Sequence, residues 1–197
     1  MKKVIFLIYV SFFILIWGKA WSLIEVDITR SNLNPLPLAV SPLSVDQKSK
    51  EKFKDSLKLE DIGVEISKVV ENNLRQSGLF NPLDPKAFLQ KPDIAHVKPR
   101  FEDWALIKAQ ALITGEVKIV DEKLRVEFRL WDVLAGKEIM ALAFTTVSEN
   151  WRRVGHIITD KIYQRLTGEK GYFDTRIIYV AEEGLKTSRI KKLAIMD

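Results

Sequence analysis

The chain contains no cysteine and only two histidines among its 197 residues. Without cysteine there is no disulfide, no thiolate nucleophile and no cysteine-ligated metal site. This absence does not exclude export to an oxidising compartment, since a fold can simply do without disulfides. His96 and His156 lie 60 positions apart, whereas metal sites usually need several such ligands or a tight carboxylate cluster. The sequence therefore predicts no metal site, and we expect both histidines at the surface or its boundary.

Motifs for phosphate binding and nucleophilic catalysis are also missing. GEKG at 168–171 follows an expected helix, where it cannot present amides at a helix N-terminus as a phosphate loop does. There is no Gly-x-Ser-x-Gly motif. We interpret Glu102-Asp103 as helix-start charges, because adjacent helical side chains point apart. Arg152-Arg153 is interpreted as a solvated helix turn beside a core-anchoring Trp151. The sequence predicts a binding or scaffolding module, not an enzyme, with no cofactor and no small-molecule substrate.

Charge is unevenly distributed. The net charge is +5, but residues 1–20 hold three lysines and no acid, which leaves 28 basic against 26 acidic residues in the rest. A nearly neutral mature chain gives no indication of a nucleic-acid partner.

The N-terminus has the pattern of a secretory signal. Lys2 and Lys3 precede a 14-residue apolar run, 4–17, and Gly18-Lys19-Ala20 supplies the small residues of a cleavage site. A spanning helix needs about 20 apolar residues, and no second run of this length follows. Residues 1–20 are therefore predicted to be a signal peptide, cleaved between Ala20 and Trp21. Cleavage after Ser22 and retention as an uncleaved inner-membrane anchor are the alternatives.

Hydropathy patterns predict the first elements of the mature chain. Residues 24–29 alternate between apolar and polar side chains, which is typical of a half-buried strand, and a second short strand is expected over 38–41. The charged stretch 46–60 is interpreted as a solvated connection.

A helix is expected between Asp61, as its N-cap, and Gly78, just beyond its end. Its apolar side chains at helical spacing are Ile62, Ile66, Val69, Val70 and Leu74. Asp84 and Pro85 have the pattern of a second helix start, and residues 101–110, around Trp104, predict a third short helix.

Three strands are expected to follow as an antiparallel meander, over 111–120, 124–133 and 138–147. In the second of them the alternation points Phe128 and three other apolar side chains inward: Leu124, Val126 and Leu130. A last helix is predicted over 149–167, ended by Gly168. Together these patterns predict an α/β fold over about 23–168, with one sheet and helices on one of its faces.

The C-terminal stretch predicts one more pair of strands, over 175–181 and 189–196, joined by a polar turn that contains Gly184. An isolated two-stranded hairpin is marginally stable in water, so the pair is expected to belong to a larger sheet.

Five stretches, in one order, resemble the TolB family of the Gram-negative cell envelope. They are SGLFNPLD (77–84), PRFEDWALIKAQALITGEV (99–117), LRVEFRLWDVLAGKE (124–138), WRRVGHIITDKIYQRLTGEKGYFDTRIIYVAEE (151–183) and RIKKLAIMD (189–197). The resemblance covers about 24–197 and is weakest over 46–60. It implies an N-terminal α/β domain, residues 21–168, in which two main helices pack on one face of a mixed five-stranded sheet. Residues 169–197 would then be a linker and the first strands of an incomplete β-propeller blade, as in a truncated reading frame, a split gene or a shortened chain.

The resemblance also implies a function. TolB proteins are periplasmic adaptors of the Tol–Pal system, which maintains the outer membrane, supports its invagination at cell division and is exploited for colicin import. In the family the mature N-terminal segment, here 21–29, binds the C-terminal domain of TolA. This assigns partner-binding residues Leu23, Ile24, Glu25, Val26, Asp27 and Ile28. The lipoprotein Pal binds the propeller mouth, to which no residue of this chain corresponds.

Three alternatives remain from the sequence. The first is a folded but non-functional remnant, the second is a membrane-tethered module with a ligand of its own, and the third is an RNA-binding module. Small mixed sheets do occur in anticodon-binding domains, but the export signal and the nearly neutral mature charge oppose that last alternative.

Overall fold

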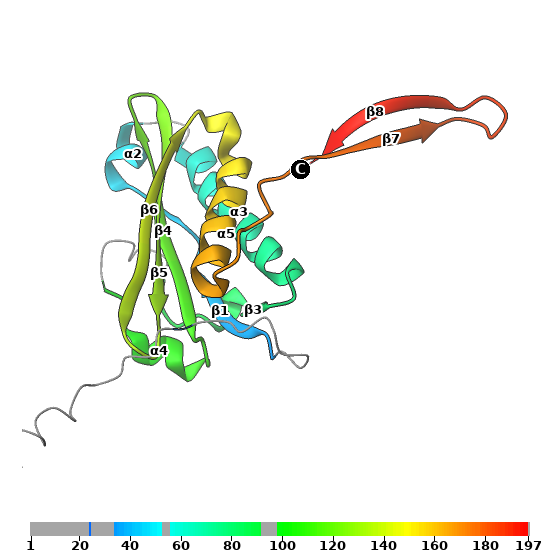
Figure 1. The fold of residues 1–197 in the computed structure, drawn as a ribbon. Coiled ribbons are helices and arrows are strands. Elements are labelled where there is room, and N and C mark those ends of the chain that lie inside the picture. Colours follow the sequence, from blue (N-terminus) through cyan, green and yellow to red (C-terminus); the bar gives the residue numbers. More distant parts are fainter. Residues whose placement is uncertain (1–23, 25–33, 53–55, 92–97, 197) are drawn as a thin grey trace, which may run out of the picture.

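The computed structural model describes residue 24 and residues 34–52, 56–91 and 98–196 (Figure 1). Within these residues five strands form a mixed sheet in the order β3-β1-β4-β5-β6. Their bounds are Leu36–Val40 for β1, Phe80–Pro82 for β3, Ala111–Val120 for β4, Lys123–Asp132 for β5 and Lys137–Thr146 for β6. A two-residue strand, β2 (Ser44–Val45), pairs with β4 beside this path. The mixed five-stranded sheet implied by the family resemblance is confirmed.

Strand direction changes in the middle of the sheet. β1 runs parallel to both β3 and β4, whereas β4–β5 and β5–β6 are antiparallel pairs. Tight turns suffice for the antiparallel pairs, and parallel neighbours need a crossover. The crossover from β1 to β3 contains the long helix α3 (Ser56–Gln76). The predicted meander is confirmed to within one residue at each strand end.

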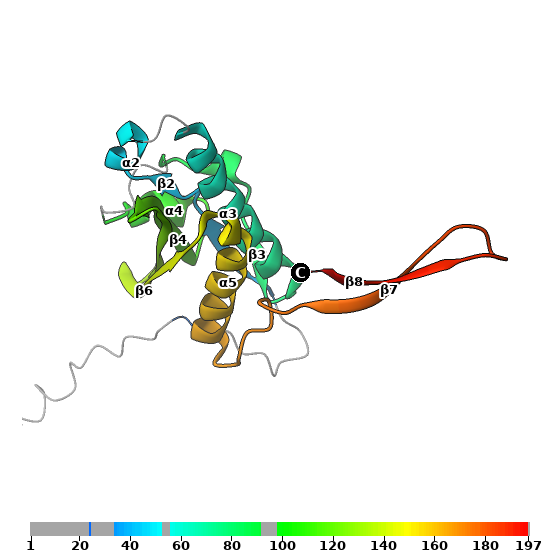
Figure 2. The ribbon, with the colours of Figure 1, turned by 90° about the horizontal axis from the view of Figure 1, so that it is seen from above.

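The main core lies between the sheet and two helices, α3 and α5 (Trp151–Thr167), which lie side by side on one face (Figure 2). Alternation along β5 places Leu124, Val126, Phe128 and Leu130 in this core, all essentially inaccessible to solvent. The helices contribute the stripes that their spacing predicted, including Ile66, Val70 and Leu74 from α3 and Val154, Ile158, Ile162 and Leu166 from α5.

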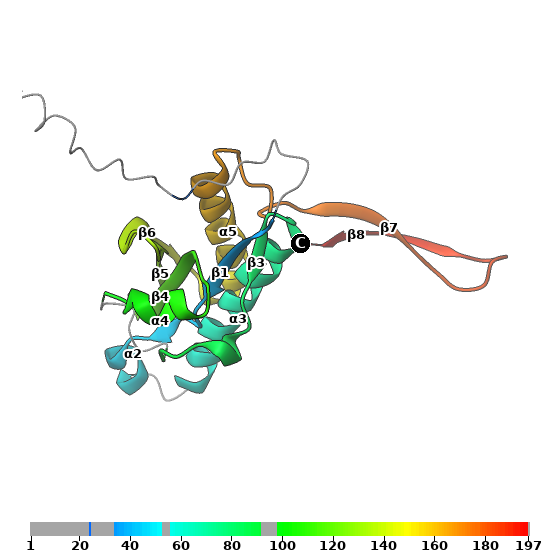
Figure 3. The same cartoon turned by 90° about the horizontal axis from the view of Figure 1, so that it is seen from below.

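A smaller cluster occupies the opposite face of the sheet. Helix α4 (Phe101–Leu106) covers one end of that face (Figure 3). Its Trp104 is buried in a cluster with Leu112 of β4 and Trp131 of β5. The residues next to these two in each strand face the main core instead. The sequence predicted a short helix here, and its Trp104 is buried. The sheet is therefore covered by the two main helices on one face and by α4 on part of the other.

The prediction of a solvated connection over 46–60 is wrong. Helix α2 (Gln47–Lys52) begins there, with Asp46 Oδ2 accepting a hydrogen bond from Ser49 N at 3.2 Å, and α3 already begins at Ser56. Asp61 is therefore an exposed residue inside α3 and not its N-cap. Leu59 is buried, so the apolar stripe of α3 continues one turn further towards the N-terminus than the denser apolar spacing after residue 61 suggested.

Other helix boundaries follow the sequence. Gly78 and Gly168 adopt φ of +73° and +79° beyond the ends of α3 and α5, a left-handed conformation that favours glycine. Asp84 caps the next turn by accepting from Lys86 N at 2.9 Å. That turn is a single 3-10 helix, η1 (Pro85–Ala87), and another, η2 (Ser148–Asn150), precedes α5.

The C-terminal strands β7 (Ile177–Glu183) and β8 (Ile190–Met196) pair with each other in a separate antiparallel sheet (Figure 1). This hairpin extends away from the α/β body, and its apolar side chains are largely exposed. The two strands are confirmed, while their place in a propeller blade stays a prediction. No helix among the described residues is both long and apolar enough to cross a membrane.

Candidate functional site

The structure describes only one of the six residues assigned to TolA binding. Ile24 is half-buried and packs against the main core. Leu23 and residues 25–28 lie outside the described residues, as do the cleavage positions Ala20 and Trp21 and all of the first predicted strand, 24–29, except Ile24. His96 also lies outside them. The segment from residue 21 to residue 29 is therefore a candidate from sequence alone.

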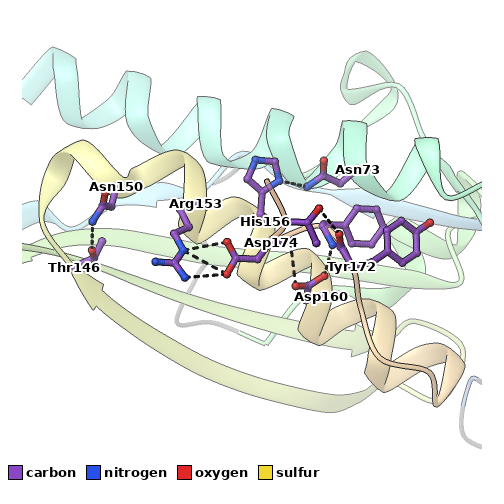
Figure 4. Close-up of polar contacts among 10 residues, drawn as sticks. Asn73, Thr146, Asn150, Arg153, His156, Asp160, Tyr172 and Asp174 are labelled. Atoms are coloured by element: carbon purple, nitrogen blue, oxygen red, sulfur yellow. Dashed lines mark hydrogen bonds and ion pairs between the residues drawn. The ribbon is translucent and has the colours of Figure 1, made fainter. Parts of the chain in front are cut away.

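His156 is buried, which corrects the prediction of a surface or boundary histidine. It lies on α5 where this helix meets α3 (Figure 4), and Asn73 Nδ2 donates to its Nδ1 at 2.9 Å. The same amide group donates to Thr159 Oγ1 at 3.2 Å, and that hydroxyl donates to the carbonyl of Gly155 at 2.8 Å. Because Nδ1 accepts here, this contact favours the tautomer of His156 that carries its proton on Nε2.

The two helices approach each other closely at this polar cluster. A Cβ atom at Gly155 would lie 2.8 Å from Cγ1 of Val69 on α3, which is too close for any larger side chain without a shift of the helices. The sequence contains an indication of this cluster. Asn73 and His156 each stand beside the apolar stripe of their helix, and Gly155 interrupts the stripe of α5. Periodicity alone could not show that they meet, because residues 77–150 separate the two helices in the sequence.

A short segment after α5 folds back along this helix. We call residues 171–174 the strap. Both carboxylate oxygens of Asp160 on α5 accept hydrogen bonds from the strap, one from Phe173 N at 2.7 Å and one from Asp174 N at 3.2 Å (Figure 4). A carboxylate that accepts from two consecutive amides is a charge-assisted contact, roughly twice as strong as a neutral one.

Arg153 holds the next residue of the strap. Its Nε and Nη2 donate to the two oxygens of Asp174 at 3.0 and 3.2 Å, in the paired geometry of a guanidinium and a carboxylate. The hydrogen bond and the charge of Asp174 raise the pKa of Arg153 above its ordinary value. The sequence interpreted this arginine as part of a solvated turn. The structure shows that it is exposed but bound to the strap, while Trp151 packs against the main core as expected.

The other charged pair behaves as predicted. Glu102 and Asp103 lie in the first turn of α4, and Asp103 Oδ2 pairs with Arg100 at 2.8 Å and accepts from Gln90 Nε2 at 3.0 Å. These contacts fix the start of a helix, where negative charge is favourable, and they leave no convergent acid pair.

Aromatic rings add an apolar contact between the strap and the body. The ring of Tyr163 on α5 meets Tyr172 and Phe173 edge-on, with centroids 5.6 and 5.7 Å apart, and it meets Phe80 of β3 at 6.2 Å. Edge-to-face pairs at these separations are favourable. Burial raises the pKa of Tyr163, so its hydroxyl stays protonated over the physiological range.

A cleft of about 580 Å³ lies between α3, α5, the strap and the base of the hairpin. Its lining includes Lys68, Asn72 and Gln76 from α3, Arg152 and His156 from α5, Tyr172 and Phe173 from the strap, and Ile177 and Met196 from the hairpin. Among the residues that the structure describes, no three His, Asp or Glu side chains gather as a metal site. The polar groups around the cleft are mostly amides and cations, with the carboxylate of Glu65 and the imidazole of His156 beside them, and the rings of Tyr172 and Phe173 add an apolar surface.

The fold and this site define an α/β module that is joined through a bound strap to a second sheet. The amino-terminal domain of TolB matches residues 24–139, more than half of the chain. The chain belongs to the TolB family.

Two relatives support this assignment. The Tol-Pal system protein TolB of Pelagibacter ubique (strain HTCC1062) is 81% identical over 185 residues, which are 94% of this chain and 42% of that protein. The chain thus spans less than half the length of this relative. The crystal structure of TolB from Acinetobacter baumannii superposes with a TM-score of 0.63 at 21% identity, over 89% of this chain and 39% of that one, and shows that the fold is shared. TolB proteins are non-enzymatic, in agreement with the prediction that this chain is not an enzyme.

Proposed function

We propose that this chain is a periplasmic adaptor of the Tol–Pal system that binds the C-terminal domain of TolA through its mature N-terminal segment, residues 21–29. The observation that carries the proposal is the 81% identity, over nearly the whole chain, to a Tol-Pal system protein TolB. At that identity the α/β domain and its N-terminal segment are expected to keep the roles that they have in the family.

The mechanism that we propose is strand addition. Ile24, Val26 and Ile28 alternate with acidic or polar residues, so an extended segment would present one apolar and one polar face. Main-chain hydrogen bonds to the edge of a TolA sheet would supply affinity, and the alternating side chains would supply selectivity. Ile24 packs against the main core, so TolA would have to compete with this contact for the same side chain.

Binding in this way would serve the roles that the family resemblance implies, which are outer-membrane integrity, invagination at division and the import of colicins. Pal binding belongs to the propeller in the family. We therefore expect that this chain by itself binds TolA and does not bind Pal.

Calorimetric titration with the C-terminal domain of TolA tests the proposal. The mature chain should bind, and a chain that lacks residues 21–29 should not. A double substitution, Val26→Pro with Asp27→Pro, sharpens the test. Proline has no backbone N–H, and consecutive strand residues point their N–H groups to opposite edges, so the double variant removes a donor whichever edge TolA occupies.

The matched control is Val26→Thr with Asp27→Asn, which keeps both N–H groups and the β-branched side chain at position 26 and should retain binding. Full binding by the deletion variant would show that the segment is not the TolA site. Tight binding of Pal by the intact chain would show that Pal recognition does not depend on the propeller mouth.

Export is the second part of the proposal. The intact mass of protein from the periplasmic fraction should correspond to a chain that begins at Trp21, or at Leu23 if cleavage follows Ser22. A full-length product found only in membranes would instead support the uncleaved anchor.

A further inference from the structure

The connection between the α/β domain and the hairpin β7–β8 is bound along its length to α5. On α5, the carboxylate of Asp160, the guanidinium of Arg153 and the ring of Tyr163 contact the amides, the Asp174 carboxylate and the two rings of the strap, as described above. We propose that the strap is a fixed joint. Because it is bound to helix α5, that helix sets the direction in which the chain continues after Asp174. This inference concerns the coupling of two sheets and goes beyond the proposed binding of TolA.

The polar contacts fix both the position and the rotation of the strap. Asp160 accepts from the amides of two consecutive residues, Phe173 and Asp174. Arg153, seven positions earlier on the same helix, grips the carboxylate of Asp174 with two nitrogens. Positions seven apart lie two turns apart on the same side of a helix, so the strap is bound at two points along one line of α5. Contacts at two separated points prevent the strap from pivoting about either one.

Gly171 allows the approach that these contacts require. A Cβ atom built there would lie 2.5 Å from the Cα of Asp160 and 2.4 Å from its Oδ1. The first of these atoms belongs to the helix backbone and cannot move aside. Only glycine therefore lets the strap come close enough for the Asp160 carboxylate to reach the two amides.

The stacked rings of Tyr172 and Phe173, with centroids 4.5 Å apart, supply the apolar part of the joint. Both rings meet Tyr163, which itself packs on Phe80 at the edge of the sheet. The strap is therefore connected through Tyr163 to the main core. A flexible linker would have a composition rich in glycine and serine and would lack such anchors.

The strap also forms one wall of the cleft. Tyr172 and Phe173 of the strap line it together with Lys68, Asn72 and Gln76 of α3, and Thr175, Ile177 and Met196 also contribute to the lining. The walls of the cleft thus come from the domain on one side and from the joint on the other. Release of the strap would remove the cleft as well as the fixed direction of the hairpin.

Spin labels can measure this direction, because the chain has no cysteine of its own. Asp61→Cys, exposed on α3, and Arg176→Cys, exposed directly after the strap, give two labels whose distance distribution is recorded by pulsed electron resonance. We expect one narrow distribution in the parent protein. Asp160→Ala with Arg153→Ala should broaden it at least twofold, and hydrogen exchange at the amides of Phe173 and Asp174 should accelerate by at least about tenfold.

The control is Arg129→Ala, which removes an ion pair with Glu138 on the sheet at the same 3.0 Å separation and should leave the distribution unchanged. Arg153→Ala alone is the second variant, because its exposed side chain can be removed without disturbing the core, and it should broaden the distribution to a smaller extent. A broad distribution in the parent protein, or an unchanged one in both strap variants, would overturn the proposal.

Discussion

Asn73 of α3 donates a hydrogen bond from Nδ2 to Nδ1 of His156 of α5 at 2.9 Å, and both side chains are buried. This contact crosses the interface between the two main helices at a point where Gly155 lets them approach each other. It connects residues that are 83 positions apart.

Replacement of this amide tests the contact. Asn73→Ala removes the donor to His156 and Thr159 and leaves buried polar atoms without that partner, which typically costs about 1–3 kcal/mol of unfolding free energy. Urea denaturation measures the difference. Asn72→Ala, at the neighbouring exposed position, should change the stability by less than about 0.5 kcal/mol. Equal effects of the two substitutions would show that the buried contact contributes nothing specific.

A substitution in the core on β5 is expected to lower the free energy of unfolding by more than Asn73→Ala does. Phe128 is buried between the sheet and the helices and stacks on Phe144 of β6, with centroids 6.2 Å apart. Phe128→Ala should lower the unfolding free energy by roughly 3–5 kcal/mol through lost burial and a cavity. Arg129→Ala, on the opposite face of the same strand, should stay within about 1 kcal/mol. A small effect at Phe128 would mean that the faces of β5 are inverted in solution.

The ion pairs of Glu127, on the outer face of the sheet, are expected to make a contribution to the stability of the fold that depends on pH. Lys118 Nζ and Arg125 Nε lie 2.7 Å from Glu127 Oε1. The hydrogen bond from Lys118, assisted by Arg125 and opposed by partial burial, holds the pKa of Glu127 below its ordinary value of 4.5. Since the folded pKa is the lower one, the stabilisation is complete above pH 4.5 and is lost as the pH falls through the folded value.

Glu127→Gln should therefore flatten the fall of stability below pH 4.5 while changing it little at neutral pH, since a partly exposed pair contributes about 0–1 kcal/mol. Urea melts above and well below that pH compare the two slopes. Identical slopes in the two proteins would show that Glu127 has the same affinity for protons in the folded and unfolded chains.

The hairpin should be the least protected sheet of the molecule. Ile178, Leu193 and Ile195 are 68%, 81% and 64% exposed, whereas Leu124 and Leu130 of β5 are fully buried. Amides of 177–196 should exchange much faster than those of 123–132, because a two-stranded hairpin opens at little cost. Hydrogen exchange followed by NMR compares them. Equal protection would show that the hairpin packs on another surface in solution, such as a second copy of the chain.

Local patterns in the sequence determined much of this fold. The alternation from 124 to 130 fixed which face of β5 is buried, because successive side chains in a strand point to opposite sides. The spacing of Ile66, Val70 and Leu74 fixed the buried face of α3 in the same way, and Gly78 and Gly168 marked helix ends through a backbone conformation that other residues avoid. Each of these signals depends only on neighbours within one or two turns of chain. The family motifs in the sequence likewise indicated the TolB family.

Only the tertiary structure decided those features that depend on contacts between residues far apart in the sequence. Leu59 is buried and extends α3 through a charged stretch whose local pattern is weak, and β2 forms only because β4 lies beside it. His156 is buried because α3 brings Asn73 to meet it. The strap is bound because Asp160 and Arg153, on one side of α5, face amides and a carboxylate that follow the helix end. In each case the stabilising contact joins groups whose proximity is created by folding itself, so no periodicity in the sequence can report it.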